Sequence, residues 1–260
     1  MANNQRSREK RREERIAEES KAASGDRRTR LLQFAAGGVF LAIIVVVVVI
    51  IAVGSGGSSG GDAANLTEKA HVEKLLSGIP QKATVLGSKT APVKLYEYGD
   101  LQCPICKEYS EEILPEIIEN QVKKGEVSIT FRNFIIIGPQ SIPAGEAALA
   151  AGAQSKGWNF IETWYRNQGE ENSGYATDEF IESMAKYVGV PNFAKWKSEW
   201  KGKKYKKTVE RTTAQAQKLG FSGTPSFSIE GPKSDGLELL NTPGSTEALE
   251  EAIEKAEKGS

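Results

Sequence analysis

The sequence predicts an α/β domain that is preceded by one N-terminal transmembrane helix. Two observations support this fold class. The 20 residues from Phe34 to Val53 carry no charge, and a helix of that length spans about 30 Å, the thickness of a bilayer. Further along, the extended segment 93–98, the helix-patterned segment 103–121 and the alternating segment 127–134 follow one another. A strand, a helix and a strand connected in this way form a right-handed βαβ unit with parallel strands.

The charges are balanced overall but unevenly distributed. Lys and Arg together number 34, as do Asp and Glu, so the composition does not favour nucleic-acid binding. Residues 1–30 hold ten basic and six acidic side chains. They are also poor in large apolar residues and cannot build a core. We interpret residues 1–30 as a charged cytoplasmic tail.

Residues 31–53 are predicted to be an uncleaved membrane anchor. The apolar run is rich in β-branched residues and has no polar face, which argues against a buried core helix. It exceeds the roughly 7–15 apolar residues of a signal peptide, and no Ala-x-Ala-like site closes it. Arg27, Arg28 and Arg30 precede it, and a Gly/Ser linker at 54–65 follows. The positive-inside rule therefore predicts a single-pass protein of the cell membrane, with the domain at 66–260 outside the cytoplasm.

The chain contains two cysteines, Cys103 and Cys106, with Pro104 and Ile105 between them. Pro104 suits the first position of a helix, because its missing N–H is not needed there. Cys103 then occupies the N-cap, where unpaired N–H groups and the helix dipole stabilise a thiolate. Residues three apart on a helix lie within the distance range of a disulfide. This spacing predicts a redox disulfide, with Cys103 as the nucleophile and Cys106 as the resolving thiol.

Two other interpretations of the cysteines are weaker. A zinc site needs four ligands, and the sequence offers two cysteines, the distant His71 and ordinary carboxylates. A purely structural disulfide that closes so short a loop would constrain the unfolded chain very little. We therefore expect redox chemistry without a metal or cofactor, and we interpret His71 as a surface or packing residue.

The remaining segments surround this unit. Thr67 is expected to cap a short helix, and a short strand is expected near 83–86. Pro115 should kink the helix that begins at the cysteines. Residues 142–219 are mostly helix-patterned. The segment 221–229 combines turn residues with a strand, a second strand near 237–240 completes a hairpin, and a final helix starts at Ser245.

The segment 195–207 contains seven lysines. It is a candidate surface for lipid headgroups or a partner, but a helix that buries Phe193, Trp196 and Trp200 and exposes its lysines is the favoured interpretation.

This order of elements resembles the thioredoxin fold, and more closely the DsbA-like thiol–disulfide oxidoreductases, in which a helical domain is inserted into that fold. The similarity covers about residues 82–258, with the insertion at about 140–219. It is carried by three stretches: Tyr96-Glu-Tyr-Gly-Asp-Leu-Gln-Cys-Pro-Ile-Cys106, the alanine-rich 144–153, and Gly223-Thr-Pro-Ser-Phe227.

The resemblance implies roles for further residues. Pro225 would be cis, with its loop beside the disulfide and with Thr224 offering its backbone to a bound substrate. Glu97 would be a buried acid that relays the proton of the resolving thiol. From the residues alone, Thr224-Pro225 indicates only a turn. A partly exposed glutamate at a strand end is the less favoured alternative for Glu97. The chain departs from the family at Ile105, where well-known members have histidine, and at Phe131, where they can carry lysine.

The function implied is that of an extracytoplasmic oxidase, which donates its disulfide to unfolded exported proteins and is re-oxidised by a membrane partner. Within the same class, a disulfide reductase or isomerase is the alternative. From another class, the alternative is a non-catalytic tethered chaperone or binding module.

Overall fold

A computed structural model of the chain describes residues 63–259. The predicted tail, the anchor and most of the linker lie outside the described residues. Within residues 63–259, no helix combines the length and the apolar character that a membrane span requires. The helices are α2 (Lys69–Leu75), α3 (Pro104–Glu112), α4 (Leu114–Ile117), the π-helical η1 (Ile118–Val122), α5 (Ser141–Gly152), α6 (Gly157–Arg166), α7 (Asp178–Tyr187), α8 (Phe193–Lys201), α9 (Lys206–Lys218) and α10 (Thr246–Lys258). The strands are β1 (Gln81–Lys82), β2 (Val85–Leu86), β3 (Val93–Gly99), β4 (Val127–Asn133), β5 (Ser226–Glu230) and β6 (Glu238–Leu240).

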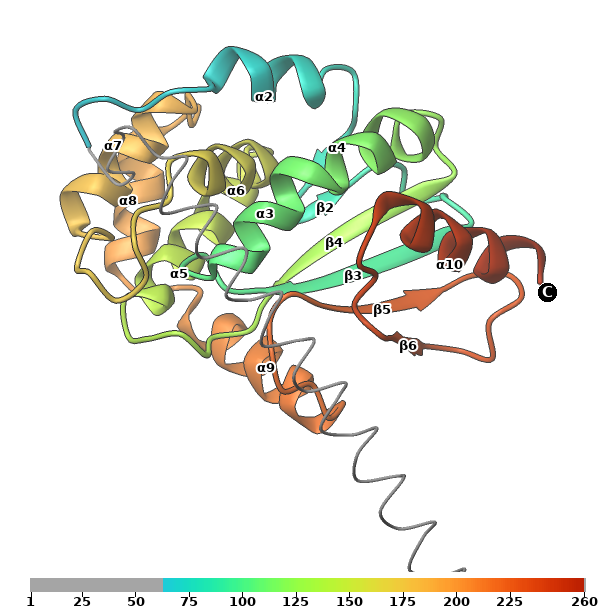
Figure 1. Cartoon of the computed structure of the whole chain (residues 1–260). Coiled ribbons are helices and arrows are strands. Elements are labelled where there is room, and N and C mark those ends of the chain that lie inside the picture. Colours follow the sequence, from blue (N-terminus) through green and yellow to red (C-terminus); the bar gives the residue numbers. More distant parts are fainter. Residues whose placement is uncertain (1–62, 260) are drawn as a thin grey trace, which may run out of the picture. The chain divides into compact units, whose positions relative to one another are not determined.

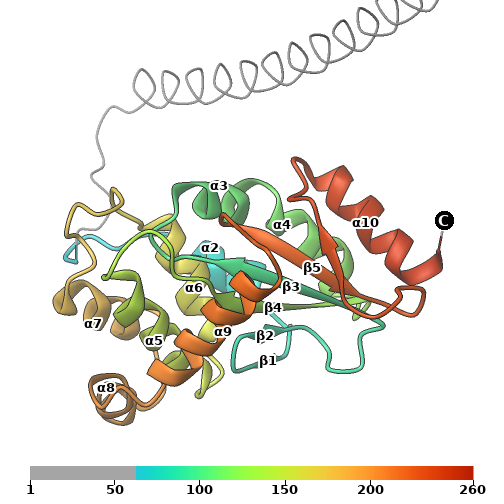
Figure 2. The same cartoon turned by 90° about the horizontal axis from the view of Figure 1, so that it is seen from below.

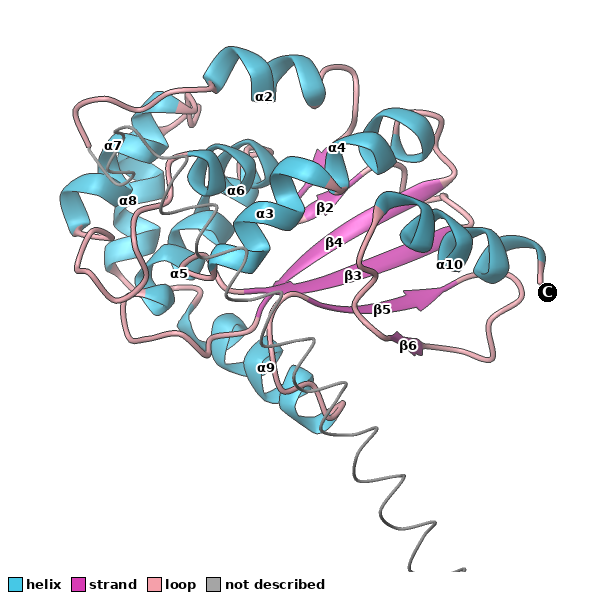
Figure 3. Ribbon diagram, in the orientation of Figure 1, coloured by secondary structure: helices cyan, strands magenta, loops and turns pink. Residues whose placement is uncertain are grey.

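The strands form one mixed sheet in the order β1-β2-β4-β3-β5-β6 (Figure 3). β3 and β4 are parallel, in a register that runs from the Val93–Val127 pair to the Gly99–Asn133 pair. The other neighbours are antiparallel. This arrangement confirms the predicted βαβ unit and the predicted terminal hairpin.

The helices cover both faces of the sheet. Helices α3, α4 and α10 lie over one face, and α9 lies over the other, against β4 (Figures 1 and 2). Helices α5 to α8 pack beside this core, where α6 contacts α3 and the strands β1 and β2. The thioredoxin-like fold is therefore present, with a helical region inserted between β4 and β5.

Large aromatic side chains of the helix-patterned segment form part of the core. Trp158, Phe160, Trp164 and Tyr165 are fully buried. In α8, Trp196 and Trp200 are buried, and their indole N–H groups donate to the carbonyl oxygens of Ala147 (3.0 Å) and Pro143 (2.9 Å). The seven lysines of 195–207 are all exposed. The segment 195–207 thus comprises the end of α8, a turn and the start of α9. As favoured from the sequence, its lysines are solvated and Trp196 and Trp200 are packed, whereas Phe193 is only half-buried.

Three local predictions need comment. The helix that begins at the cysteines is interrupted at Ile113, just before Pro115, and continues as α4 and η1, which confirms the expected kink. The strand expected at 83–86 is a short hairpin, because Ala83 turns the chain with a positive φ of 54°.

The capping prediction for Thr67 is wrong. The N-cap of α2 is Glu68, whose side chain makes no capping hydrogen bond. The Thr67 N–H donates instead to the Asn167 side-chain oxygen at 2.8 Å, a tertiary contact that outweighs the local preference.

Candidate active site

The two cysteines lie at the start of α3, under the segment that leads from β5. Cys103 is the N-cap and Pro104 occupies the first turn. The Cys103 sulfur accepts a hydrogen bond from the Cys106 N–H at 3.3 Å, which satisfies one of the free amides of the helix end. Cys103 is 3% exposed and Cys106 is fully buried, and both are free thiols. Cys103 is therefore the sulfur nearer to solvent.

The environment separates the acidities of the two thiols. The hydrogen bond from the Cys106 thiol, helped by the N–H groups of Cys106 and Ile105, lowers the pKa of Cys103 from 9.0 to about 7, although burial opposes this shift. Burial, together with the neighbouring Cys103, raises the pKa of Cys106 well above its ordinary value. Near neutral pH, Cys103 is the thiol that ionises and Cys106 keeps its proton.

The loop before β5 lies directly against the Cys103 sulfur. The Thr224–Pro225 peptide bond is cis, as the family resemblance implied. The Cys103 thiol donates to the Thr224 carbonyl oxygen at 3.3 Å. The Pro225 carbonyl oxygen accepts from the Thr242 hydroxyl at 2.9 Å, which holds this loop to the segment after β6.

Glu97 is a buried acid in the middle of the sheet. It is 1% exposed, and within the described part of the chain neither carboxyl oxygen has a hydrogen-bond partner. Its neighbours in the register are Phe131 on β4 and Phe227 on β5. Burial, with a smaller contribution from the charge of Glu162, raises the pKa of Glu97 from 4.5 to about 8. The interpretation as a partly exposed strand-end glutamate is therefore wrong.

Side chains of the helical insertion hold the loop that precedes Cys103. The Leu101 carbonyl oxygen accepts from the Trp164 indole (2.7 Å), the Gln168 amide (2.8 Å) and the Tyr175 hydroxyl (3.3 Å). The Gln168 amide also donates to the Cys103 carbonyl oxygen at 3.1 Å. These residues were missed as site residues, because they lie more than 60 positions away and no local pattern links them to the cysteines.

Asp100 was also missed. It is fully buried, and its carboxylate accepts from the N–H groups of Gln102 (2.9 Å), Ile136 (2.9 Å) and Ile137 (3.0 Å). It thereby ties the loop after β4 to the loop before the cysteines. The available signal was an acid directly after a buried strand, three residues before Cys103.

A buried ion pair joins α3 to the insertion. Glu162 and Arg166, one turn apart on α6, are 2.6 Å apart, and the Ser110 hydroxyl of α3 donates to Glu162 at 3.1 Å. The pair fixes α3 against α6. It also places a second carboxylate close enough to Glu97 to affect its pKa.

Comparisons with known proteins identify the family. The family model described as Thioredoxin matches residues 80–255. The chain belongs to the thioredoxin family. It is 34% identical over 152 residues to a probable disulfide bond formation protein D of Bacillus cereus, a match that covers 56% of this chain and 69% of the relative. It is 25% identical over 177 residues to the disulfide bond formation protein D of Bacillus subtilis, covering 67% and 77%.

A solved structure agrees. Oxidised BdbD from Bacillus subtilis matches with a TM-score of 0.60 and 25% identity, over 69% of this chain and 96% of that one. The chain is therefore a DsbA-like, thioredoxin-fold protein thiol–disulfide oxidoreductase.

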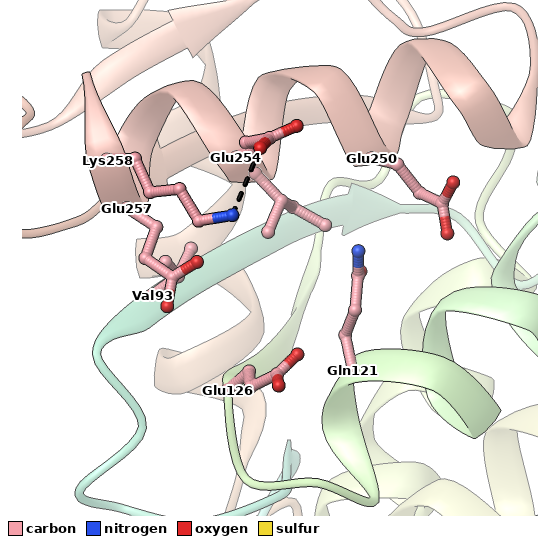
Figure 4. A pocket seen from close by; sticks show the side chains of 8 residues that line it. Val93, Gln121, Glu126, Glu250, Glu254, Glu257 and Lys258 are labelled. Carbon is pink, nitrogen blue, oxygen red and sulfur yellow. Dashed lines mark hydrogen bonds and ion pairs between the residues drawn. The ribbon is translucent and has the colours of Figure 1, made fainter.

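Two hollows lie on the α10 side of this oxidoreductase. One, of about 420 Å³, begins at Ile105, which is 51% exposed, and runs between α3 and the segment before α10. The other, of about 260 Å³, lies at the far end of α10 and is lined mainly by glutamates (Figure 4). There Gln121 points towards α10, and Lys258 pairs with Glu254. Only the first hollow adjoins the cysteines.

Among residues 63–259, no three His, Cys, Asp or Glu side chains are grouped to hold an ion. His71 is exposed on α2.

Proposed function

We propose that this oxidoreductase is an oxidase that introduces disulfides into unfolded exported proteins. The observation that carries the proposal is the unequal pair of thiols, an acidic Cys103 at the helix end and a protonated, buried Cys106. A sulfur with a low pKa is a good leaving group, so the reduced enzyme is stabilised and the disulfide is readily given away. The names of the relatives, disulfide bond formation proteins, support this direction.

In the first step, a client thiolate attacks the Cys103 sulfur of the Cys103–Cys106 disulfide. A bond forms between the client sulfur and Cys103, and the bond to Cys106 breaks with its electron pair on the Cys106 sulfur. A buried thiolate there is unfavourable, so it takes a proton. Glu97, whose pKa is raised to about 8, carries a proton that it can donate to the Cys106 sulfur.

In the second step, another client thiolate attacks the client sulfur of the mixed disulfide. The client disulfide forms and Cys103 departs as a thiolate, a form that its pKa of about 7 favours. Two electrons have passed from the client to the enzyme. Pro104, Ile105, Thr224 and Pro225 border the reacting sulfur, and we assign the Thr224 backbone to pairing with the extended client.

The location and the redox partner belong to the same proposal. The basic flank and the apolar run at 31–53 support anchoring in the cell membrane with the domain outside the cytoplasm. Each turnover leaves Cys103 and Cys106 reduced, so an oxidant must restore the disulfide. An anchored domain would meet such an oxidant at the membrane, and we propose a membrane redox protein as this partner.

A reductase or isomerase is the second candidate, and one observation favours it. The pKa of Cys103, about 7, matches the roughly 7 of thioredoxin rather than the roughly 3.5 of DsbA. The direction of electron flow therefore decides between the candidates.

Thiol trapping tests the proposal. The full-length protein is alkylated directly in its native membrane. A Cys103→Ser/Cys106→Ser double variant, which has no thiol to alkylate, gives the gel mobility of the unmodified protein. An oxidase should rest mainly as the disulfide, ready for clients. A resting dithiol would refute the oxidase and favour the reductase. If the protein bound a reduced unfolded client but exchanged no thiols with it, a binding module would be indicated.

A further inference from the structure

Tyr109 lies on α3, one turn after Cys106, and faces the sheet. It is 4% exposed, and its ring centroid is 4.7 Å from that of Phe227. Its hydroxyl is buried and has no hydrogen-bond partner among residues 63–259. Buried hydroxyl groups are normally paired, so this one calls for a partner.

The Glu97 carboxyl is the neighbouring group that could accept a hydrogen bond from this hydroxyl. Glu97 and Phe227 are partners in the antiparallel register of β3 and β5, and such partners project their side chains from the same face of a sheet. The Tyr109 ring therefore packs on the immediate neighbour of Glu97. Burial and then the charge of Glu97 raise the pKa of the Tyr109 hydroxyl, so it remains a hydrogen-bond donor at all relevant pH values.

Tyr109 also borders solvent on its other side. It lines the hollow that begins at Ile105, between α3 and the segment before α10. Glu108 and Glu112 line the same hollow. Tyr109 thus packs on the register partner of Glu97 and also lines a hollow that is open to solvent.

We propose that Tyr109 is a positioning residue for proton transfer at Glu97, donating a hydrogen bond through one water to the carboxylate that remains after Glu97 has protonated Cys106. The inference rests on the proposed role of Glu97. The proton that joins the Cys106 sulfur comes from Glu97. Tyr109 keeps its own proton throughout, and Glu97 regains one from water in the hollow. The hydroxyl stabilises the charged form of an acid that no other group among the described residues hydrogen-bonds.

The test is the pH profile of disulfide reduction in the full-length protein. The rate at which a cysteine-containing client peptide reduces the Cys103–Cys106 disulfide is measured and corrected for the client thiolate fraction. The rate should fall as Glu97 ionises. In Tyr109→Phe the Glu97 carboxylate loses a hydrogen-bond donor, so the pKa of Glu97 rises. The fall in rate should therefore occur about one pH unit higher, which corresponds to one hydrogen bond to a charged group. Tyr109→Leu should shift the profile in the same direction, since it also lacks the hydroxyl.

Two controls separate this role from packing. Tyr205→Phe removes another hydroxyl that donates to a glutamate, Glu199 at 2.9 Å in the insertion, and should leave the profile unchanged. In a Glu97→Gln background, Tyr109→Phe should have no further effect on the profile. Thermal unfolding of each variant confirms that it is folded.

Three results would overturn the inference. The first is a Tyr109→Phe profile that superimposes on that of the unsubstituted protein. The second is an equal shift with and without Glu97. The third is a Glu97→Gln variant whose profile is unaltered, which would remove the role of Glu97 as well. The oxidase proposal is judged separately by the resting redox state, which none of these measurements uses.

Discussion

Glu97 of β3 lies opposite Phe131 of β4 in the parallel register of the sheet. Phe131 occupies the position at which related oxidoreductases can carry a lysine, and here its ring is buried. The register partners of this buried acid are thus two phenylalanines, Phe131 and Phe227, and neither is a cation. Desolvation therefore dominates its acidity and keeps it protonated up to about pH 8.

The first prediction concerns stability and pH. A carboxyl whose pKa rises from 4.5 in the unfolded chain to about 8 in the fold binds more protons when folded, so stability should fall as pH rises through this window. The loss should be on the order of 3–4 kcal/mol. Denaturant unfolding of the reduced full-length protein at several pH values measures it.

Glu97→Gln should flatten this dependence, because glutamine does not ionise. Glu116→Gln, at an exposed position of α4, is the matched control and should retain the slope. A slope that is unchanged in Glu97→Gln would show that Glu97 is not the titrating group.

The second prediction concerns the order of attack. Cys103 is the more accessible and more acidic thiol. Cys106→Ser should therefore accumulate a mixed disulfide between Cys103 and a client, because the resolving thiol is missing. Cys103→Ser should accumulate none. Gel mobility of the full-length variants, with and without reductant, reports the adduct, and similar adducts in both variants would contradict the assigned roles.

The third prediction concerns redox potential. With a Cys103 pKa of about 7, the potential should lie between that of DsbA, about −120 mV, and that of thioredoxin, about −270 mV. Ile105→His should raise it by tens of millivolts, because a cationic neighbour stabilises the thiolate. Equilibration of the full-length protein with glutathione buffers measures the potential.

The matched control is Leu239→His, a similarly exposed apolar position on β6, which should leave the potential unchanged. A potential as low as that of thioredoxin in the unsubstituted protein would favour the reductase. A potential that does not respond to Ile105→His would show that the residue at position 105 does not stabilise the Cys103 thiolate.

The fourth prediction concerns topology. The arginines before Phe34, and the absence of basic residues directly after Val53, predict a cytoplasmic N-terminus. Protease added to intact spheroplasts should digest residues 66–260 and spare an epitope within residues 1–30. Permeabilised spheroplasts serve as the control and should lose the epitope. Loss of the epitope in sealed spheroplasts would reverse the proposed orientation.

Local rules explain what could be predicted from the sequence. The spacing of Cys103 and Cys106 and the fit of Pro104 to a first turn place two thiols at a helix end, whatever surrounds them. Ser245 caps α10 as expected, with its hydroxyl accepting from the Ala248 N–H at 3.3 Å. The aromatic spacing of α8 likewise identified its buried side.

Tertiary structure decided the chemistry around those thiols. The pattern of its own strand does not decide whether Glu97 is exposed or buried. The packing of Phe131, Phe227 and α3 around it excludes water and so raises its pKa. Leu101 is held by side chains of the insertion, and Thr67 leaves its expected cap for Asn167. The physical reason is that helix caps and periodicity act within a turn or two, whereas desolvation and long-range hydrogen bonds depend on residues that meet only after the chain has folded.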